Sequence, residues 1–279
     1  MTLTVYRPAA EAFWEDISAL RQTTPLIHNI TNQVVAPYNA NVLLAFGAAP
    51  VMAHAHEEVA DMATLANALI LNIGTLDPYR VDAMKIAMSA AIRAGKPVVL
   101  DPVGAGATPY RTETACELIA LGPPSIIRGN ASEIMSLTGL SATTRGVESA
   151  ISPDAAIHAA RKLARQIGGV VCVSGKNDHV VDHTGRWLTL SNGHEWMTRV
   201  TGTGCAASAM TGAVAAVQHD YWRATASAMA YLGVAGEMAA ENVIRENRGL
   251  GSFQAALLDY LQLLPRETFI SKLALAHRG

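Results

Sequence analysis

The sequence predicts an α/β fold in which a mostly parallel β-sheet carries helices on both faces. Short, continuous apolar runs bounded by glycine and proline alternate with longer segments of helical spacing, a pattern typical of parallel sheets buried on both sides. Of the 279 residues, 50% are hydrophobic but only 5% are aromatic, so small aliphatic side chains must build the core and let helices lie close to a sheet. The length suits one large α/β domain or two small ones. We expect one domain over residues 1–279, because no linker-like stretch or internal repeat interrupts the pattern.

The first part of the chain alternates helix-like and strand-like segments. Phe13, Ile17 and Leu20 fall on one face of the first predicted helix. Gly47 and Gly95 each follow a segment of helical spacing, where glycine commonly ends a helix. In chain order, we expect a helix at 10–22, a strand at 26–30, a helix at 33–46, a strand at 50–53, a helix at 57–66, a strand at 69–73 and a helix at 78–94.

The second part of the chain starts with the clearest strand, Pro-Val-Val-Leu at 97–100, and continues the alternation. Three long helical patterns finish the chain. In order, we expect a helix at 112–121, a strand at 125–127, helices at 132–137 and 153–167, strands at 169–173, 179–181 and 187–190, and helices at 205–218, 221–242 and 253–264.

The composition argues against several classes of protein. The formal net charge is −2 and no basic run is present, whereas nucleic-acid binding needs clustered Lys and Arg that neutralise phosphates. Cys116, Cys172 and Cys205 are scattered without metal-ligand spacing, which argues against a disulfide framework and fits a reducing compartment. The N-terminus lacks the apolar stretch of a signal peptide, and the apolar stretch at 204–217 is too short to span a bilayer. We therefore expect a cytoplasmic protein without nucleic-acid or membrane partners.

Polar and glycine-rich segments follow several of the predicted strands. In open parallel sheets, ligands bind just beyond the carboxyl ends of the strands. The segments at these positions are Asn-Ile-Gly at 72–74, Asp-Pro-Val-Gly at 101–104, Arg-Gly-Asn at 128–130 and Ser-Gly-Lys at 174–176. We therefore expect the functional site at this edge of the sheet.

A glycine-rich segment, Thr-Gly-Thr-Gly-Cys at 201–205, precedes a long predicted helix of small residues. Glycine lets the backbone approach a ligand closely, and the start of a helix presents unpaired N–H groups and the positive end of the helix dipole. Gly202, Thr203 and Gly204 would then form an anion hole for a phosphoryl group in transfer. The alternative is an ordinary glycine-rich turn before a buried helix. The segment is not a Walker A loop, because the Gly-Lys-Ser/Thr ending is missing.

Two carboxylates are candidate metal ligands. Asp101 directly follows a buried strand, where it could hold Mg²⁺ through water, since Mg²⁺ keeps much of its hydration shell. Glu133 stands three residues after Asn130 and would be a second carboxylate near the metal and the phosphates. Each has a structural alternative: Asp101 could cap the following loop, and Asn130 with Glu133 has the spacing of a helix capping box.

Taken together and in order, the motifs are more specific than any one of them. Asp-Pro-Val-Gly, Asn-x-x-Glu, Ser-Gly-Lys and Gly-Thr-Gly-Cys, at 101–104, 130–133, 174–176 and 202–205, resemble the ribokinase-like superfamily. Within it, the chain resembles the hydroxyethylthiazole kinases through His-Asn-Ile-Thr-Asn at 28–32, Pro-Val-Met-Ala at 50–53, Leu-Asn-Ile-Gly-Thr-Leu at 71–76 and Gly-Leu-Gly-Ser-Phe at 249–253. The resemblance runs from about residue 25 to residue 264, nearly the whole chain.

The resemblance implies a ribokinase-like three-layer α/β/α sandwich and a kinase that depends on ATP and Mg²⁺. The expected reaction is transfer of the ATP γ-phosphoryl group to the primary alcohol of 4-methyl-5-(2-hydroxyethyl)thiazole, which gives the thiazole phosphate used to build thiamin phosphate. The resemblance also implies a homotrimer with sites near the subunit interfaces.

The resemblance further implies roles for individual residues. The implied substrate contacts are Met52, the backbone of Gly202 and Asn29. The implied ATP contacts are Arg128 and Ser174, while Asp101 and Glu133 would bind Mg²⁺ and thereby organise the phosphates. Asn29 and Asn32 could each be a substrate contact or a loop-turn residue, and the sequence leaves both alternatives open.

Cys205 stands where most ribokinase-like sugar kinases have an aspartate general base, so the resemblance implies a catalytic role for it. A thiol is a poorer base than a carboxylate near neutral pH. A helix N-terminus lowers the pKa of such a thiol, whereas a nearby triphosphate raises it. Phosphoryl transfer depends mostly on positioning and charge stabilisation, so a weak base need not abolish it.

Three rival functions stay open on the sequence alone. They are a kinase for another hydroxymethyl compound such as the pyrimidine half of thiamin, an ATP- or ADP-dependent dehydratase of hydrated nicotinamide nucleotides, and a non-catalytic nucleotide sensor. We expect the two rival enzymes to carry Asp after the glycines, and a sensor to lose Asp101, Glu133 or Cys205, none of which is lost. Cys205 after Gly-Thr-Gly, together with His-Asn-Ile-Thr-Asn, therefore favours the thiazole kinase.

Overall fold

The computed structural model describes residues 7–139 and 153–277. Within these residues, nine strands form one sheet in the order β2-β1-β3-β4-β5-β6-β7-β8-β9. The strands are β1 (Leu26–Ile30), β2 (Ala49–Val51), β3 (Ala68–Asn72), β4 (Val98–Asp101), β5 (Ile126–Asn130), β6 (Val170–Ser174), β7 (Asp178–Asp182), β8 (Trp187–Leu190) and β9 (Leu275–His277). All pairs from β2 to β6 are parallel and all pairs from β6 to β9 are antiparallel, which confirms the predicted, mostly parallel sheet. 

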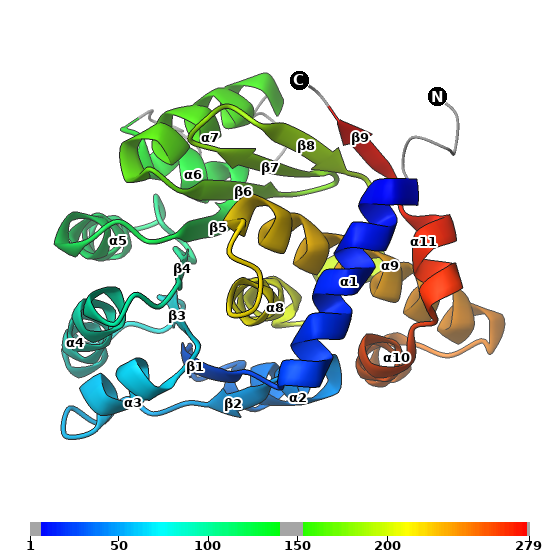
Figure 1. Ribbon diagram of the computed structural model, residues 1–279, viewed down its shortest axis with the longest axis horizontal. Coiled ribbons are helices and arrows are strands. Elements are labelled where there is room, and N and C mark those ends of the chain that lie inside the picture. The colour runs from blue at the N-terminus through cyan, green and yellow to red at the C-terminus, as the bar shows by residue number, and fades with distance from the viewer. Residues whose placement is uncertain (1–6, 140–152, 278–279) are drawn as a thin grey trace.

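Helices cover both faces of the sheet, which confirms the three-layer α/β/α architecture (Figure 1). Each helical layer shares one apolar cluster with the sheet face beneath it. One layer holds α1 (Arg7–Thr23), α2 (Ala36–Phe46), α8 (Thr203–Ala215), α9 (Tyr221–Arg245), α10 (Leu250–Leu263) and α11 (Arg266–Lys272). The other holds α3 (Val59–Leu65), α4 (Pro78–Arg93), α5 (Pro109–Leu121), α6 (Ala131–Leu137) and α7 (Pro153–Ile167). 

Strand alternation decides which face the polar strand ends occupy. In β3, Ala68 and Ile70 belong to the apolar cluster that contains α8, whereas Leu69 and Leu71 belong to the cluster on the other face. Because successive side chains of a strand point to opposite faces, Asn72 points toward the α8 layer. Asp101 is the register partner of Asn72 in β4, so the same face of the sheet carries both.

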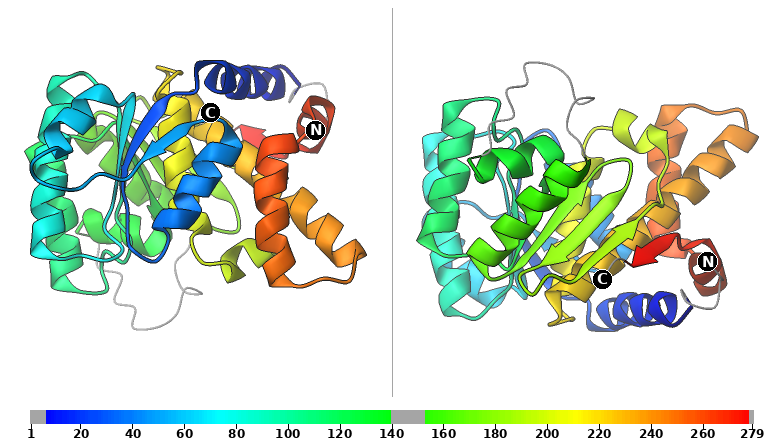
Figure 2. Two further views of the ribbon diagram at one scale, coloured as in Figure 1. Left: turned by 90° about the horizontal axis from the view of Figure 1, so that it is seen from below. Right: turned by 90° about the horizontal axis from the view of Figure 1, so that it is seen from above.

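A few elements differ from the sequence predictions. Helix α5 begins at Pro109, three residues before the predicted start, because proline is well tolerated in a first helical turn and Thr108 caps it by accepting from the N–H of Arg111 at 3.3 Å. The short helix η3 (Glu195–Arg199), α11 and β9 were not predicted. Strand β9 has only three residues and is formed by pairing with β8, far away in the sequence (Figure 2, right).

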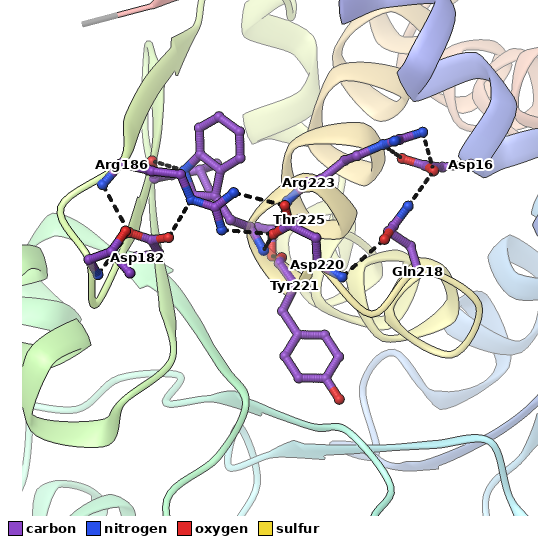
Figure 3. A network of polar contacts seen from close by, with 11 residues as sticks. Asp16, Asp182, Arg186, Gln218, Asp220, Tyr221, Arg223 and Thr225 are labelled. Atoms are coloured by element: carbon purple, nitrogen blue, oxygen red, sulfur yellow. Dashed lines mark hydrogen bonds and ion pairs between the residues drawn. The ribbon is translucent and has the colours of Figure 1, made fainter. Parts of the chain in front are cut away.

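A buried polar network fastens α1 to α9 (Figure 3). The carboxylate of Asp16 in α1 is 4% exposed and accepts hydrogen bonds from Gln218 Nε2 (2.9 Å), Arg223 Nε (2.9 Å) and Ser227 Oγ (2.7 Å). Three hydrogen-bond donors compensate the buried negative charge of Asp16, so the network stabilises the packing of α1 against α9. Among the residues that the structure describes, no helix combines the length and the hydropathy that a bilayer span requires.

Candidate active site

The loop before α8 takes its shape from Gly202. This residue has φ 97° and ψ −7°, in the left-handed region that favours glycine. A Cβ atom at Gly202 would lie 2.9 Å from both Tyr38 Cδ1 and Val35 Cγ1, so the start of α2 packs directly on this glycine. Helix α8 then begins at Thr203, and the first N–H groups of a helix have no partner inside it. The helix start therefore offers the unpaired N–H groups that an anion hole needs, and anion binding at Gly202, Thr203 and Gly204 stays a prediction.

Asp101 is a buried carboxylate at the end of β4, only 1% exposed. Its Oδ2 atom accepts hydrogen bonds from Asn72 Nδ2 at 2.7 Å and from Ser208 Oγ of α8 at 2.9 Å. Burial raises the pKa of Asp101 to about 7, and the charge of Arg128 lowers it only in part, while the charge of Glu133 adds to the increase. Ionised Asp101 would therefore be stabilised by an additional cation.

Cys205 lies in the first turn of α8 and is joined to Asp101 by side-chain amides. Asn32 Nδ2 lies 3.4 Å from Cys205 Sγ and donates to Asn72 Oδ1 at 2.9 Å, and Asn72 in turn donates to Asp101. Burial and the charge of Asp101 raise the pKa of the Cys205 thiol to about 11, although the amides of Asn72 and Asn32 lower it in part. The thiol is therefore mostly protonated at neutral pH when no ligand is bound. The helix start does not lower its pKa enough to make it an effective base.

Arg128 connects the end of the sheet to the start of α8. Its Nη1 atom donates to the carbonyl oxygen of Gly204 at 3.0 Å, and its Nη2 atom donates to Ser174 Oγ at 2.6 Å. Its Nε atom is buried without a hydrogen-bond partner among the described residues. The two predicted ATP contacts, Arg128 and Ser174, thus lie together beside the predicted anion hole.

Glu133 forms the capping box that its spacing suggested. Its Oε2 atom accepts from the N–H of Asn130 at 2.8 Å, and the side chain of Asn130 accepts from the N–H of Glu133 at 2.9 Å. The other oxygen, Oε1, accepts from the N–H of Gly104 in the loop after Asp101, also at 2.8 Å. Glu133 therefore joins the start of α6 to the loop that follows β4.

The pair of Asp101 and Glu133 fits a magnesium ion better than a softer metal. Both supply carboxylate oxygens, and no cluster of three or more His, Cys, Asp or Glu side chains suited to a metal occurs in residues 7–139 and 153–277. Glu133 raises the pKa of Asp101, so the two negative charges repel each other, and a divalent cation held by these residues would relieve this repulsion. With two protein carboxylates, Mg²⁺ would keep several water or phosphate ligands.

Arg111 in α5 holds together the two loops that follow β3 and β4. Its guanidinium donates to three carbonyl oxygens, those of Ile73 (3.3 Å), Gly74 (2.8 Å) and Val103 (2.6 Å). Its Nη1 atom would lie 3.0 Å from a Cβ placed on Gly104, so the guanidinium also packs directly against that glycine. The loops that directly follow Asn72 and Asp101 are thus fixed relative to each other by one side chain.

Met52 and Asn29, the remaining predicted substrate contacts, lie on the β2–β1 side of the site. Met52 is partly exposed and follows β2 directly. Asn29 is fully buried in β1, where its register partner in β3 is Ile70 and not Asn72. Its Oδ1 and Nδ2 atoms have no hydrogen-bond partner among the described residues. No described hydrogen bond joins either side chain to the group around Cys205, so their contact with substrate stays a prediction.

Three residues of this site did not receive a role from the sequence, namely Asn72, Ser208 and Arg111, and Asn32 was weighed only as a substrate contact or a loop-turn residue, not as a partner of Cys205. Asn32 and Asn72 lay inside motifs, but only the packing of α8 on β1 and β3 brings them to Cys205. The sequence could have indicated Ser208, because a residue three positions after Cys205 in a predicted helix lies on the same face as Cys205. No sequence pattern indicated the role of Arg111, since its three hydrogen-bond partners lie in the loops that follow β3 and β4.

Comparisons with known proteins agree on one family. A model of the hydroxyethylthiazole kinase family matches residues 17–267. The chain is 60% identical to a hydroxyethylthiazole kinase of Leptothrix cholodnii over 279 residues, which is the full length of both chains. It is 49% identical to a hydroxyethylthiazole kinase of Syntrophus aciditrophicus over 264 residues, covering 94% of this chain and 96% of the relative.

One solved structure shows the same family relationship, and another shows only the same fold. The structure of a hydroxyethylthiazole kinase from Pyrococcus horikoshii superimposes with a TM-score of 0.87 at 39% identity, covering 96% of this chain and 99% of the other. A pyridoxal kinase from Staphylococcus aureus superimposes with a TM-score of 0.56 at 16% identity, covering 76% of this chain and 88% of the other. The second similarity concerns the fold alone.

Proposed function

Since the chain belongs to the hydroxyethylthiazole kinase family, we propose that it transfers the γ-phosphoryl group of ATP to the hydroxyl of 4-methyl-5-(2-hydroxyethyl)thiazole. The product would be the thiazole phosphate that is used to make thiamin phosphate. The observation that carries the proposal is the series of side-chain hydrogen bonds that joins Cys205, through Asn32 and Asn72, to Asp101. Cys205 lies in the first turn of α8, where Arg128 donates to the carbonyl oxygen of Gly204. 

In the proposed reaction, the alcohol oxygen attacks the γ-phosphorus, the bond from that phosphorus to the bridging oxygen of ATP breaks, and the hydroxyl proton is released. The N–H groups at Gly202, Thr203 and Gly204 would stabilise negative charge on the transferred group. Arg128 and Ser174 would hold ATP, Arg128 through the charged hydrogen bonds that a guanidinium forms with phosphate oxygens. 

We place the thiazole ring beside the loop before α8, on the side of that loop where β1 and β2 lie. Met52, the backbone of Gly202 and Asn29 are the proposed contacts of this substrate. The unpartnered amide of Asn29 supports its assignment, because a buried amide without a protein partner needs a hydrogen bond from a ligand or a water molecule.

Asp101 and Glu133 would hold Mg²⁺, and bound Mg²⁺ would neutralise part of the phosphate charge. The support is the repulsion between these two carboxylates, together with their preference for a hard cation. A chelator should therefore abolish the reaction.

Cys205 would contact the hydroxyl that accepts the phosphoryl group. With a pKa of about 11, the free thiol is mostly protonated at neutral pH, so only a small thiolate fraction could accept the hydroxyl proton. We therefore assign most of the rate to positioning and charge stabilisation, and a smaller part to proton acceptance by Cys205.

The assembly and location of the protein are part of the same proposal. By resemblance to the family, we propose that the single domain assembles into a homotrimer with sites near the interfaces and that it works in the cytoplasm. Sedimentation velocity of the purified protein tests the trimer, because a monomer of 29.4 kDa and its trimer sediment very differently.

An ATP-consumption screen tests the activity. The thiazole alcohol, the hydroxymethylpyrimidine of thiamin and hydrated NADH are each supplied with Mg²⁺ and ATP, with and without excess chelator. We expect metal-dependent consumption with the thiazole alcohol and a product heavier by one phosphoryl group. Turnover of the pyrimidine or of hydrated NADH alone would favour the rival enzymes, and no turnover of any of them would favour a nucleotide sensor.

A further inference from the structure

We propose that Asn32 is a positioning residue for the transfer: it holds the sulfur of Cys205 in place, and its own orientation is set through Asn72 by the backbone of Gly74. This inference rests on the proposed function, because it assigns the residue to that reaction. It is carried by three contacts, namely Gly74 N to Asn72 Oδ1 (3.0 Å), Asn32 Nδ2 to Asn72 Oδ1 (2.9 Å) and Asn32 Nδ2 to Cys205 Sγ (3.4 Å).

Two fixed groups determine which atoms of the asparagine amides donate and which accept: the backbone N–H of Gly74 can only donate, and the carboxylate of Asp101 provides an acceptor. A backbone N–H can only donate, so the Asn72 atom that faces Gly74 N must be its oxygen. The amide nitrogen of Asn72 is then directed at Asp101 Oδ2, 2.7 Å away, where an acceptor is available. The Asn32 atom facing Asn72 Oδ1 must therefore be its nitrogen, which leaves a hydrogen of that same –NH₂ group for Cys205 Sγ.

Packing removes the remaining freedom of the Asn32 amide. The side chain is buried, with 4% of the residue exposed. A Cβ atom on Gly74 would lie 2.7 Å from Asn32 Nδ2 and 2.9 Å from its Cγ, so the Gly74 backbone lies directly against the amide group. The amide is thus enclosed between Gly74 on one side and Cys205 on the other and cannot turn over without losing its contact with Asn72.

This arrangement fixes what Cys205 can offer to a substrate. Because the sulfur receives an N–H from Asn32, the S–H hydrogen of the protonated thiol must point away from that amide. The side of the sulfur away from the amides of Asn32 and Asn72 is where we propose that the acceptor hydroxyl binds. Asn32 would therefore act through Cys205, and its loss should matter only while the cysteine is present.

A double-mutant cycle on kcat tests this dependence. We expect Cys205→Ala and Asn32→Ala each to lower kcat for the thiazole alcohol by about 10- to 100-fold, at or below the lower end of what a positioned proton-transfer group contributes. The double variant should be no more than about twofold slower than Cys205→Ala alone, because residues that act as one unit are not additive. A double variant that shows the product of the two single losses would overturn the proposal.

Asn39 provides a matched control for this cycle. It is another buried asparagine, 1% exposed, whose Nδ2 atom donates to Thr31 Oγ1 at 3.3 Å and does not contact Cys205. Any loss of kcat caused by Asn39→Ala should be the same in the parent and in the Cys205→Ala background. If Asn32→Ala behaves in the same way as Asn39→Ala, the role of Asn32 is packing alone and the proposal is wrong.

A second measurement decides the proposal without any kinase activity. Asn32→Asp keeps the size of the side chain but replaces the N–H donor by a carboxylate, so it should make the thiolate of Cys205 harder to form. We expect the rate of alkylation of Cys205 by iodoacetamide at pH 9, followed by mass spectrometry of its peptide, to fall at least about tenfold. Asn39→Asp should change this rate by less than about twofold.

An unchanged alkylation rate in the Asn32→Asp variant would contradict the contact between Asn32 and Cys205. Failure of the unmodified protein to phosphorylate the thiazole alcohol would instead refute the proposed function. The two failures are distinguishable, because the alkylation comparison needs neither ATP nor the alcohol.

Discussion

The Nη1 atom of Arg128 donates to the carbonyl oxygen of Gly204 across 3.0 Å, although 76 residues separate them in the chain. This contact ties β5 to the first turn of α8 and holds the guanidinium against Gly204. Its second nitrogen donates to Ser174 Oγ. A ligand with several negative oxygens would meet a fixed cation and a set of backbone donors at the same place.

Replacing Arg128 should therefore weaken the binding of ATP more than that of the thiazole. We expect Arg128→Ala to raise the KM for ATP by about 10- to 100-fold, the range for loss of hydrogen bonds to a charged group, with a much smaller effect on the KM for the thiazole alcohol. Steady-state kinetics with each substrate varied in turn measures both. Arg165→Ala, at an exposed position of α7, is the matched control and should leave both values unchanged. Equal effects of Arg128→Ala on the two substrates would count against the assignment.

Arg111 should be needed as an arginine and not only as a cation. Lysine cannot reach the carbonyl oxygens of Ile73, Gly74 and Val103 with one ammonium group in the same geometry. We expect Arg111→Lys to lower kcat about tenfold, because the lost hydrogen bonds are each worth roughly 1–2 kcal/mol and loosen the loops that carry the site.

Hydrogen exchange tests this reading of Arg111 directly. Peptides that cover residues 72–76 and 102–106 should exchange faster in Arg111→Lys, while peptides of the distant α9 should not. Arg93→Lys, at an exposed position at the end of α4, is the control. Unchanged exchange in both loops would show that Arg111 does not hold them together.

Local sequence patterns were enough to predict most of the fold. The run Val98-Val99-Leu100 is apolar because β4 is buried on both faces, and the polar residue that ends it, Asp101, is therefore placed at the ligand edge. The glycines at 202 and 204 signalled the start of α8 in the same local way. Such signals lie within a few residues of the feature they predict.

Contacts between distant segments could not be read from such patterns. Asn32 meets Cys205 across 173 residues of sequence, and no spacing or composition rule connects them. The pKa of Cys205 is a second example. The sequence shows the helix start that would lower it, but the burial and the nearby Asp101 that raise it exist only after α8 packs on the sheet.

His28 should make the protein less stable in acid. Its Nε2 atom lies 2.7 Å from the carbonyl oxygen of Ala53 and must donate to it, while Nδ1 is buried without a partner among the described residues. Burial lowers the pKa of His28, and the hydrogen bond to Ala53 and the charge of Glu58 offset this only in part. The folded state thus favours the neutral ring, so this contribution to stability is present above the ordinary histidine pKa of about 6.5 and is lost as the pH falls below it.

Urea unfolding at pH 7.0 and pH 5.0 measures this effect. The free energy of unfolding should fall between these pH values more steeply in the parent than in His28→Gln, by at most about 1.4 kcal/mol per pH unit. Glutamine retains an N–H donor for Ala53 but does not titrate. Identical pH dependence in the two proteins would mean that His28 does not contribute to the acid sensitivity.

The identity of residue 205 connects the structure most closely to the proposed chemistry. If its side chain meets the acceptor hydroxyl while the backbone of residues 202–205 binds the phosphoryl group, then changing the side chain should alter chemistry and leave nucleotide binding intact. Cys205→Asp should remain active and could exceed the parent, because a carboxylate is similar in reach and a better proton acceptor at neutral pH. If Cys205 were only a small packing residue, alanine would be tolerated and aspartate would suffer from burial of a charge near the triphosphate.

The most direct test of the account is therefore to measure kcat for the thiazole alcohol and the Kd for ATP in the parent, Cys205→Ala and Cys205→Asp. The account predicts that Cys205→Ala loses about 10- to 100-fold in kcat, that Cys205→Asp keeps at least the activity of the parent, and that the Kd for ATP of the alanine variant is nearly unchanged. A fully active alanine variant beside an inactive aspartate variant would contradict it, and would leave Cys205 as a packing residue at the start of α8.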